Sequence, residues 1–376
     1  MLLNLNRAIK MRIYPNDEQR HKIDVTLSHC RYIYNKMLER NTVIYNRRKE
    51  HLNYYAMQNL LPEMKDYLPW LKEADSQALK YACRQLNTAF EKFFHKQGGY
   101  PRFHSKHGKQ SYTATNMSSV YIVPHKIKLP CLGWIRTSDK RIPKGKLCYA
   151  TISHNTDGRY YVSICYEKEM PDVTFVKPSV NKTIGLDYKS DGLFMDSNGH
   201  IEDIPHFYRE AQRKRTKLQR RLSKKQGARK GEHKSMNFMK QLRKVSRQSM
   251  HIANQRRDYL HKLSTEIANR YDAVCVEDLD MKAISNKDFG NGKATMDNGY
   301  GMFQNMLLYK LKERGKHLVV VDKWYPSTKL CHCCGHRQPM PLKIRVYQCP
   351  ECGMVFDRDW NAAINIKMEG LRLLSA

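Results

Sequence analysis

The chain has 376 residues and a formal net charge of +31, because 67 Lys and Arg outnumber 36 Asp and Glu. No apolar run approaches the ~18 residues of a membrane-spanning helix, and the first residues lack the apolar core of a secretory signal. These features predict a cytoplasmic protein of two or three domains. So large a positive charge favours a polyanionic partner, chiefly nucleic acid, with an acidic membrane surface as the alternative.

The first half of the chain is predicted to be a β-module with helices inserted into it. Alternating basic and apolar residues over 7–14 are typical of a half-buried strand, and Asn16 is placed to cap the helix that follows. Helical spacing of apolar residues continues to about residue 97. Short β-branched and aromatic runs then occupy 111–170, with a hairpin expected at Asp157-Gly158. The N-terminal strand should complete this module.

The second half predicts an α/β core of the RNase H-like kind. The expected elements are antiparallel strands over 184–199, helices over 208–267, a buried strand at 273–277, a helix at 302–315, a strand at 317–322 and a last helix from about residue 359. The Gly- and Asn-rich segment 285–301 is predicted to be a loop. From its composition we expect it to act as a mobile lid.

Five of the eleven cysteines lie between residues 331 and 352, which favours a metal site over a disulfide framework. The pairs Cys331-x2-Cys334 and Cys349-x2-Cys352 match the spacing of a tetrahedral four-thiolate zinc site. Cys333 is an alternative ligand within Cys331-His332-Cys333-Cys334, but only Cys331 and Cys334 keep the CxxC spacing. Four thiolates leave no open position for a substrate water, so the zinc ion is predicted to be structural.

Three acidic residues are candidates for a metal-dependent phosphodiesterase site. Asp187 and Glu277 each end a short apolar strand, where a buried carboxylate is costly unless it is paired or binds a metal. Asp359 starts the last predicted helix. Each acid alone also has an ordinary explanation as a turn acid, an ion-pair partner or, like Asp357, a helix cap. Spacing does not exclude four nearby carboxylates, Asp191, Asp278, Asp280 and Asp322.

Four ordered blocks resemble signature segments of the TnpB proteins of insertion sequences, which are similar to the type V CRISPR effector nucleases. Residues 184–187 (IGLD) resemble the first RuvC motif, and 276–279 (VEDL) resemble the second. Residues 324–335 (WYPSTKLCHCCG) resemble the entry to the zinc-binding insertion of that family. Residues 349–353 (CPECG), running into 357–366 (DRDWNAAINI), resemble the third RuvC motif.

The resemblance implies that Asp187, Glu277 and Asp359 are the catalytic triad and hold two Mg²⁺ ions. Asp359 is chosen because it lies two residues before Asn361. One ion would activate water for attack on the scissile phosphate, and the other would stabilise the leaving 3′ oxygen. The implied fold is an RNase H-like RuvC domain with a zinc-ribbon insertion, preceded by an N-terminal wedge β-barrel with an inserted helical recognition domain.

The resemblance also implies the domain boundaries. They are a first wedge strand at 1–15, a helical recognition domain at 16–105, the rest of the wedge β-module at 106–178, the first part of the RuvC domain at 179–324, the zinc-binding target-nucleic-acid insertion at 325–356, and the third RuvC motif with the C-terminal helix at 357–376.

Basic segments are candidates for nucleic-acid contacts. Residues 209–257 hold 18 Lys and Arg against two acids, and so many like charges would repel one another without a counter-surface, although a solvated face is the alternative. The segment 100–106 mixes aromatic and cationic residues, which suits either a stacking surface or an ordinary linker. The candidate contacts are Tyr54, Tyr55, Gln77, Lys80, Arg84, Arg102, Lys214, Arg220, Arg221 and Lys224.

The sequence therefore predicts an endonuclease that carries a guide RNA and cuts double-stranded target DNA beside a short adjacent motif. It is expected to act as a monomer on its RNA, at the nucleoid of a bacterial cell. Three alternatives stay open. A nuclease-inactive RNA-guided repressor should have lost an acid, an accessory transposase would work without RNA on a similar core, and a zinc-ribbon DNA-binding protein would leave the acids unused.

Overall fold

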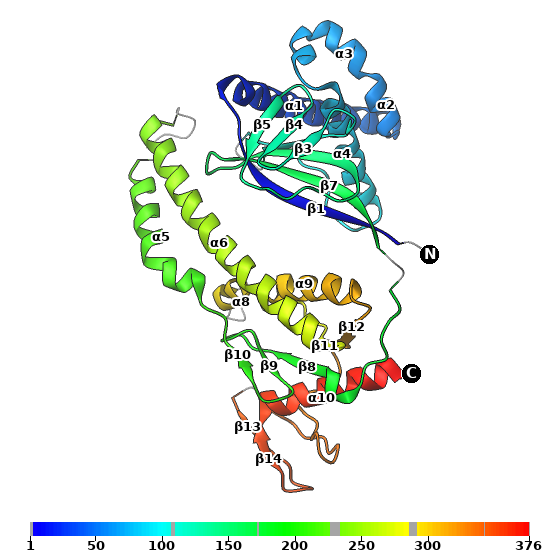
Figure 1. Ribbon diagram of the computed structural model, residues 1–376, viewed down its shortest axis with the longest axis vertical. Helices are drawn as coiled ribbons and strands as arrows, with labels where there is room; N and C mark the ends of the chain where they lie inside the picture. Colours follow the sequence, from blue (N-terminus) through cyan, green and yellow to red (C-terminus); the bar gives the residue numbers. More distant parts are fainter. Residues whose placement is uncertain are drawn as a thin grey trace. The chain divides into compact units, whose positions relative to one another are not determined.

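The structure is a computed structural model that describes residues 3–106, 110–170, 173–225, 234–285, 292–341 and 343–375. It divides into two compact units, Met1–Asp172 and Val173–Ala376, whose helices and strands are labelled in Figure 1. Each unit has its own apolar core. Among the described residues, no helix is both long and apolar enough to cross a membrane.

The first unit is built on a seven-stranded antiparallel sheet in the order β2-β6-β7-β1-β5-β4-β3. Its strands are β1 (Leu3–Tyr14), β2 (Gln110–Ala114), β3 (Tyr121–Val123), β4 (Lys126–Leu129), β5 (Gly133–Thr137), β6 (Lys146–His154) and β7 (Tyr160–Met170). The N-terminal strand does add to the β-module, since β1 pairs with both β7 and β5. The predicted hairpin joins β6 to β7, and Gly158 in its turn adopts a left-handed φ of 77°.

Helices are inserted between β1 and β2, as the sequence predicted. They are α1 (Asp17–Arg48), α2 (Tyr54–Asn59), α3 (Leu61–Tyr67), the short 3₁₀ helix η1 (Pro69–Glu73) and α4 (Ser76–Phe94). The Asn16 side chain accepts a hydrogen bond from the backbone N–H of Gln19, and the Gln19 side chain accepts one from the backbone of Asn16. This capping box starts α1. Buried side chains of α1, α4 and the sheet form one core.

The second unit contains a mixed five-stranded sheet in the order β10-β9-β8-β11-β12. Its strands are β8 (Thr183–Tyr188), β9 (Phe194–Asp196), β10 (Ile201–Glu202), β11 (Ala273–Glu277) and β12 (His317–Val321). The strands β8, β11 and β12 run parallel, whereas β9 and β10 form antiparallel pairs. A short 3₁₀ helix, η2 (Val180–Lys182), leads into β8.

The two faces of this sheet carry different helices. Ile184 and Val274 pack in one core with α6 (Met236–Arg270) and α9 (Tyr300–Lys312). Cys275 lies on the other face and packs with Ile366 of α10 (Arg358–Ser375). Figure 1 shows α10 on one side of the sheet and the helices α6 and α9 on the other. Because side chains alternate along a strand, residues 187 and 277 belong to the α10 face.

The remaining elements flank this core. They are α5 (Phe207–Ser223), which packs along α6, the short helices α7 (Met281–Ile284) and α8 (Gly292–Asn298), and the two-stranded antiparallel pair β13 (Val346–Gln348) and β14 (Val355–Asp357).

The prediction of a loop over 285–301 is wrong for its second part. Residues Gly292–Asn298 form α8, and α9 begins at Tyr300, while 286–291 lie outside the described residues. The Gly- and Asn-rich composition concealed a helix whose polar side chains are buried rather than solvated.

Two side chains of α8 anchor it to the unit. Asp297 is 2% exposed and accepts hydrogen bonds from the backbone N–H of Tyr208 and from Arg256. Asn298 is fully buried and donates to the backbone oxygens of Lys189 and Ser190. The described part of the segment is therefore a fixed element of the core, which argues against a lid there.

Candidate active site and metal centre

The parallel strands β8 and β11 deliver two acids to the same edge of the sheet. Leu186 pairs with Val276, so the next residues, Asp187 and Glu277, lie side by side at the carboxyl ends of these strands. Ligand sites of α/β sheets typically form at this edge. Asp187 is 9% exposed, and Glu277 accepts a hydrogen bond from the Ser327 hydroxyl at 3.4 Å between oxygens.

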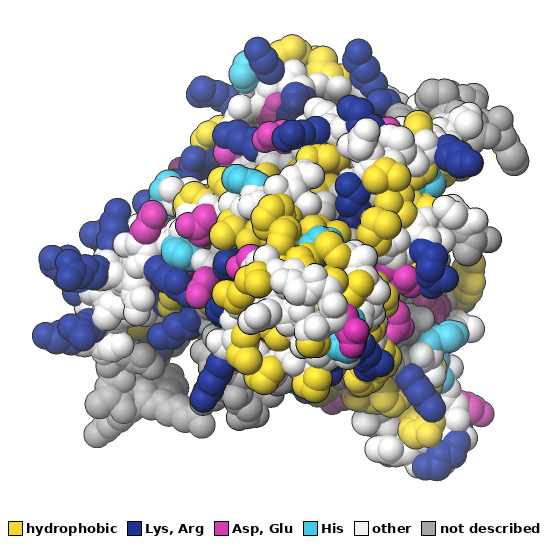
Figure 2. Space-filling view, turned by 90° about the horizontal axis from the view of Figure 1, so that it is seen from below, with side chains coloured by type: hydrophobic (Ala, Val, Ile, Leu, Met, Phe, Trp, Pro, Cys, Tyr) yellow, Lys and Arg dark blue, Asp and Glu magenta, His cyan; other side chains and the backbone are white. Residues whose placement is uncertain are grey.

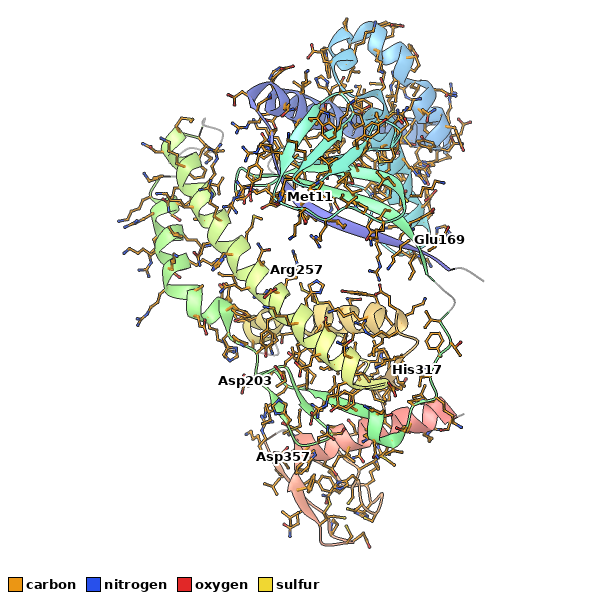
Figure 3. The ribbon with its side chains drawn as sticks, viewed as in Figure 1. Met11, Glu169, Asp203, Arg257, His317 and Asp357 are labelled. Atoms are coloured by element: carbon orange, nitrogen blue, oxygen red, sulfur yellow. The ribbon has the colours of Figure 1, made fainter. Side chains whose placement is uncertain are left out.

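The third acid, Asp359, comes from the first turn of α10, which packs across β8. The side chain of Asp357 accepts hydrogen bonds from the backbone N–H groups of Asp359 and Trp360, both at 2.9 Å. Asp357, at the junction of β14 and α10, is therefore the helix cap (Figure 3). Asp359 is the acid that contributes to the buried site.

The electrostatics of Asp187 show that the three acids share one environment. Burial raises the pKa of Asp187 well above its ordinary range, and the nearby carboxylates of Glu277 and Asp359 raise it further. Burial also raises the pKa of Glu277. A desolvated cluster of like charges is unfavourable unless cations neutralise it.

Cationic side chains of the chain itself pair with Asp359. The Nε and Nη2 atoms of Arg358 donate to its Oδ1 at 2.9 and 2.7 Å, and Nη1 of Arg345 donates to its Oδ2 at 3.2 Å. Lys189 lies 4.0 Å from the same Oδ2. Among the described residues, the sulfur atoms of the four cysteines lie close enough together to bind one metal ion. The carboxylate oxygens of the three acids are further apart than that.

The four predicted zinc ligands, Cys331, Cys334, Cys349 and Cys352, place their sulfur atoms within 4.8 Å of one another. The Sγ atoms of Cys331 and Cys352 are 3.7 Å apart, and those of Cys334 and Cys349 are 3.5 Å apart. A tetrahedron with Zn–S bonds of about 2.3 Å has edges of about 3.8 Å. The arrangement therefore fits a four-thiolate zinc site.

The knuckle backbones also suit a metal site. Gly335 and Gly353 follow the two CxxC pairs with φ of 76° and 70°, a conformation that glycine adopts without strain. Backbone N–H groups, chiefly that of Cys352, lower the pKa of Cys349 to about 6, which favours its thiolate form. The exposed Cys333 lies outside the cluster, with its sulfur 3.2 Å from that of Met354.

Two asparagines of α10 connect this cysteine-rich insertion to the acidic site. Asn365 is 5% exposed and donates to the backbone oxygens of Ser327 and Leu330, both at 2.8 Å. Asn361 is fully buried, donates to the Leu330 oxygen and accepts from the backbone N–H of His332. The insertion is thereby fixed to the helix that carries Asp359.

The alternative carboxylates have other roles or lie in solvent. Asp191, Asp278 and Asp280 are exposed, and the Asp280 side chain accepts from the backbone N–H of Ala283. Asp322 accepts from the backbone N–H of Trp324. Ser327, Arg345, Arg358 and Asn365 were not named as neighbours of the acids from the sequence. Two signals were available: Arg358 directly precedes Asp359, and Asn361 and Asn365 are one helical turn apart.

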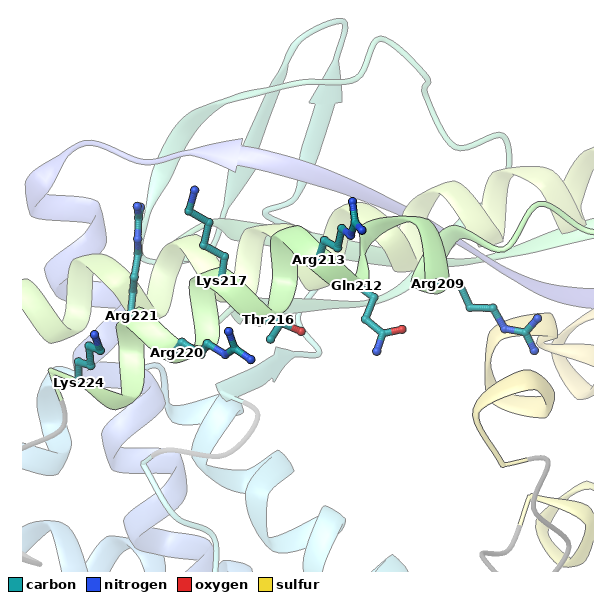
Figure 4. Close-up of a pocket in the computed structure, with 8 residues that line it drawn as sticks. All are labelled: Arg209, Gln212, Arg213, Thr216, Lys217, Arg220, Arg221 and Lys224. Carbon is teal, nitrogen blue, oxygen red and sulfur yellow. The ribbon is translucent and has the colours of Figure 1, made fainter.

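The candidate nucleic-acid residues of the second unit lie on α5 or, for Lys224, at its C-cap, and α5 has no buried residue among those described. One face of α5 carries a line of cations interrupted by two uncharged polar side chains (Figure 4). Its residues are Arg209, Gln212, Arg213, Thr216, Lys217, Arg220, Arg221 and Lys224. Of the four candidates, Arg220, Arg221 and Lys224 belong to this face, while Lys214 is exposed beside it. Lys and Arg are also spread over the surface seen in Figure 2.

The candidates of the first unit have mixed exposure. Tyr54 packs against the core, whereas Tyr55 is 71% exposed. Gln77 and Lys80 are half-buried on α4, and Arg84 is exposed there beside a hollow that Arg31 and Phe103 also line. Arg102 is exposed, but the residues on either side of it pack against the first unit and do not form an unattached linker. His104 stacks on Tyr34, and Tyr100 packs edge-on against Phe90.

Comparison with known proteins identifies the family. The chain is 34% identical over 382 residues to a predicted RNA-guided DNA endonuclease of Streptomyces pristinaespiralis, covering 99% of this chain and 91% of that protein. It is 29% identical to the predicted RNA-guided DNA endonuclease InsQ of Escherichia coli K12, over 98% of this chain and 93% of the relative. The chain belongs to the TnpB family. A TnpB-like mimivirus protein is 32% identical over 35% of the chain.

Family models and a solved structure agree with membership in the TnpB family. Residues 163–288 match a model described as "Probable transposase", and residues 300–366 match the TNB domain of Cas12f1-like proteins. The fold matches that of Cas12f1 in its complex with sgRNA and target DNA, with a TM-score of 0.59 at 14% identity, over 97% of this chain and 99% of that one. The fold of this TnpB protein is thus that of the Cas12f-like type V effectors.

A third model, described as a helix-turn-helix domain, matches residues 1–50. The described part of this range contains one strand, β1, and one uninterrupted 32-residue helix, α1. The structure therefore places a β-strand and a long helix where the description of that model names two helices and a turn.

Proposed function

We infer that this TnpB-family chain is an RNA-guided DNA endonuclease that cuts its target beside a short adjacent motif. The observation that carries the proposal is the convergence of Asp187, Glu277 and Asp359 from two parallel strands and one helix. The parallel strands flanked by an antiparallel hairpin, with α10 on one face, support a RuvC domain of the RNase H-like fold. The first unit would supply the wedge β-barrel and the inserted recognition helices.

The donor chemistry of the acids fits Mg²⁺, which prefers carboxylate oxygens. Two bound Mg²⁺ ions would supply the activation of water and the stabilisation of the leaving 3′ oxygen. Asp187 and Glu277 would hold them at the sheet edge, with Asp359 opposite. Arg345 and Arg358 would then lie beside the scissile phosphate, since both already contact Asp359. The raised pKa of Asp187 means that it must lose its proton before it binds a cation.

The cysteine cluster would hold a structural zinc ion through Cys331, Cys334, Cys349 and Cys352. Its role would be to shape the insertion, because four thiolates saturate a tetrahedral ion. Asn361 and Asn365 would transmit that shape to the acidic site. The basic face of α5 would contact the phosphates of the guide RNA or its target. We further propose that the protein works as a monomer on its RNA at the bacterial nucleoid.

The test begins with sequencing of the RNA that copurifies with the protein. The complex is then incubated with matched DNA and Mg²⁺, beside the variants D187A and D191A. Asp191 lies in the turn that follows β8, four residues after Asp187, but it is exposed, so D191A should cut as the unaltered protein does. Guided binding without cutting would indicate the repressor, and cleavage or strand transfer without a specific RNA would indicate the transposase.

A further inference from the structure

Trp324 is the most exposed large apolar side chain among the described residues, at 80%. The backbone at Trp324 is nevertheless ordered, because its N–H donates a hydrogen bond to the Asp322 side chain at 2.7 Å. The next residue, Tyr325, turns inward and packs against the core of Cys275, Val321 and Ile366. The indole is therefore held outward by a fixed turn.

This turn lies at the edge of the sheet where the acids converge. In the parallel register of β11 and β12, Val321 pairs with Glu277, and the backbone N–H of Asp278 donates to the Val321 oxygen. Trp324 follows Val321 by three residues, a reach of at most about 10 Å. Ser327, three residues further on, donates to Glu277. The segment that presents the indole is thus bound to the acidic site at both of its ends.

The surroundings of the indole suit a nucleobase. The ammonium group of Lys323 lies over the Trp324 ring, 5.1 Å from its centre. An exposed aromatic face beside a cation is the combination by which proteins bind unpaired strands, with the base on the ring and the phosphate at the cation. An apolar protein partner would not need the cation, and a fully paired duplex offers no exposed base face.

We propose that Trp324 stacks on an unpaired base of the DNA strand next to the scissile phosphate and so holds that strand at Asp187, Glu277 and Asp359. Lys323 contacts the adjoining phosphate. This inference rests on the proposed endonuclease function and assigns a strand-binding residue to it. Since every base has a stacking face, the contact is independent of sequence.

A binding experiment tests the contact without any cleavage. The guide-RNA complex, without added divalent cation, is titrated with a short oligothymidylate while its tryptophan fluorescence is recorded. The chain has four tryptophans, so the signal of Trp324 is the difference between the unaltered protein and W324F. We expect quenching that W324F removes. Quenching that persists unchanged in W324F would overturn the proposal.

Cleavage of matched DNA provides the second measurement. W324A should lower cleavage about tenfold at limiting substrate while leaving guided binding of the target within about twofold. W324F, which keeps a stacking ring, should recover most of the activity. The control is W134A, because Trp134 is also exposed, at 49%, but lies on β5 in the first unit. It should cut normally.

Two further results would contradict the proposal. One is unaltered cleavage by W324A. The other is an equal loss in W324A and W324F, which would indicate a structural role. If the unaltered complex did not cut at all, the endonuclease function would fail, whereas the quenching experiment would still decide whether Trp324 binds a strand.

Discussion

Gly185 of β8 lies directly against Ala363 of α10. A Cβ atom placed on Gly185 would be 2.1 Å from the Ala363 carbonyl oxygen and 2.7 Å from the Lys367 backbone nitrogen. Glycine therefore permits the helix to approach the strand more closely than any other residue would. Because Asp187 is two residues from Gly185, and Asp359 is one turn before Ala363, this approach sets how near the two acids come.

The variant G185A should consequently separate α10 from β8. We expect a loss of about 1–3 kcal/mol in the free energy of unfolding of the second unit, together with reduced cleavage. Urea denaturation measures the first effect. The matched control is G301A, since a Cβ on Gly301 would meet one methionine side-chain atom at 3.9 Å and the position is helical. G301A should be neutral or slightly stabilising.

Replacing Asp187 should separate stability from activity. The pKa of Asp187 is raised above its ordinary value of 3.8, so the folded protein keeps this proton to a higher pH than the unfolded chain does. Without added Mg²⁺, stability should therefore fall as pH rises through the raised pKa. D187N, which cannot ionise, should be more stable than the unaltered protein at neutral pH and should show a shallower decline.

D187N should also cut matched DNA at least about 10–100-fold more slowly than the unaltered protein. Loss of even an outer contact of a metal site reduces activity by that factor, and Asp187 is proposed to bind the metal directly. Urea titrations at several pH values, beside cleavage assays, check both expectations. D191N should change neither quantity, because Asp191 is exposed. A D187N protein that is less stable than its parent at neutral pH would contradict the electrostatic argument.

The geometry of the cysteine cluster predicts which cysteines bind the zinc ion. C352S should lose bound zinc and, with it, cleavage, because metal binding and the folding of such an insertion are one process. C333S should keep both, since Cys333 lies outside the cluster. Zinc content by atomic emission and cleavage of matched DNA are the measurements. Zinc loss in C333S with retention in C352S would reverse the assignment.

Asn365 should matter for activity although it is not expected to touch substrate. N365A leaves the backbone oxygens of Ser327 and Leu330 without this donor, at a cost of about 1–3 kcal/mol. The displaced Ser327 should weaken cleavage while zinc content stays unchanged. N305A serves as the control, because Asn305 is exposed and donates only within α9. Zinc loss in N365A would indicate unfolding of the insertion instead.

Prediction from the sequence succeeded for features whose signal is local. The capping box at Asn16, the hairpin at Gly158 and the CxxC spacing each depend on a few neighbouring residues. It failed at α8, whose Gly- and Asn-rich composition is typical of a loop. The helix is held in the core because Asp297 binds Tyr208 and Arg256, which are distant in sequence.

The position of the three acids likewise could not be predicted from local sequence signals. Motif resemblance selected Asp187, Glu277 and Asp359, but no pattern along the chain places them together. Their proximity depends on the parallel register of β8 with β11 and on the close packing of α10. The contacts of Arg345 and Asn365 with this region join residues that lie apart in sequence and are created by the tertiary fold.

The central position of β1 has a consequence for how the first unit folds during synthesis. Ile13 pairs with both Thr137 and Tyr160, so the first strand made must wait for partners more than a hundred residues later. The helices α1 to α4 contain local contacts and can form meanwhile, whereas closing such long loops is slow. A nascent chain that stops within β6 would expose unpaired strand edges, and such truncated products should aggregate.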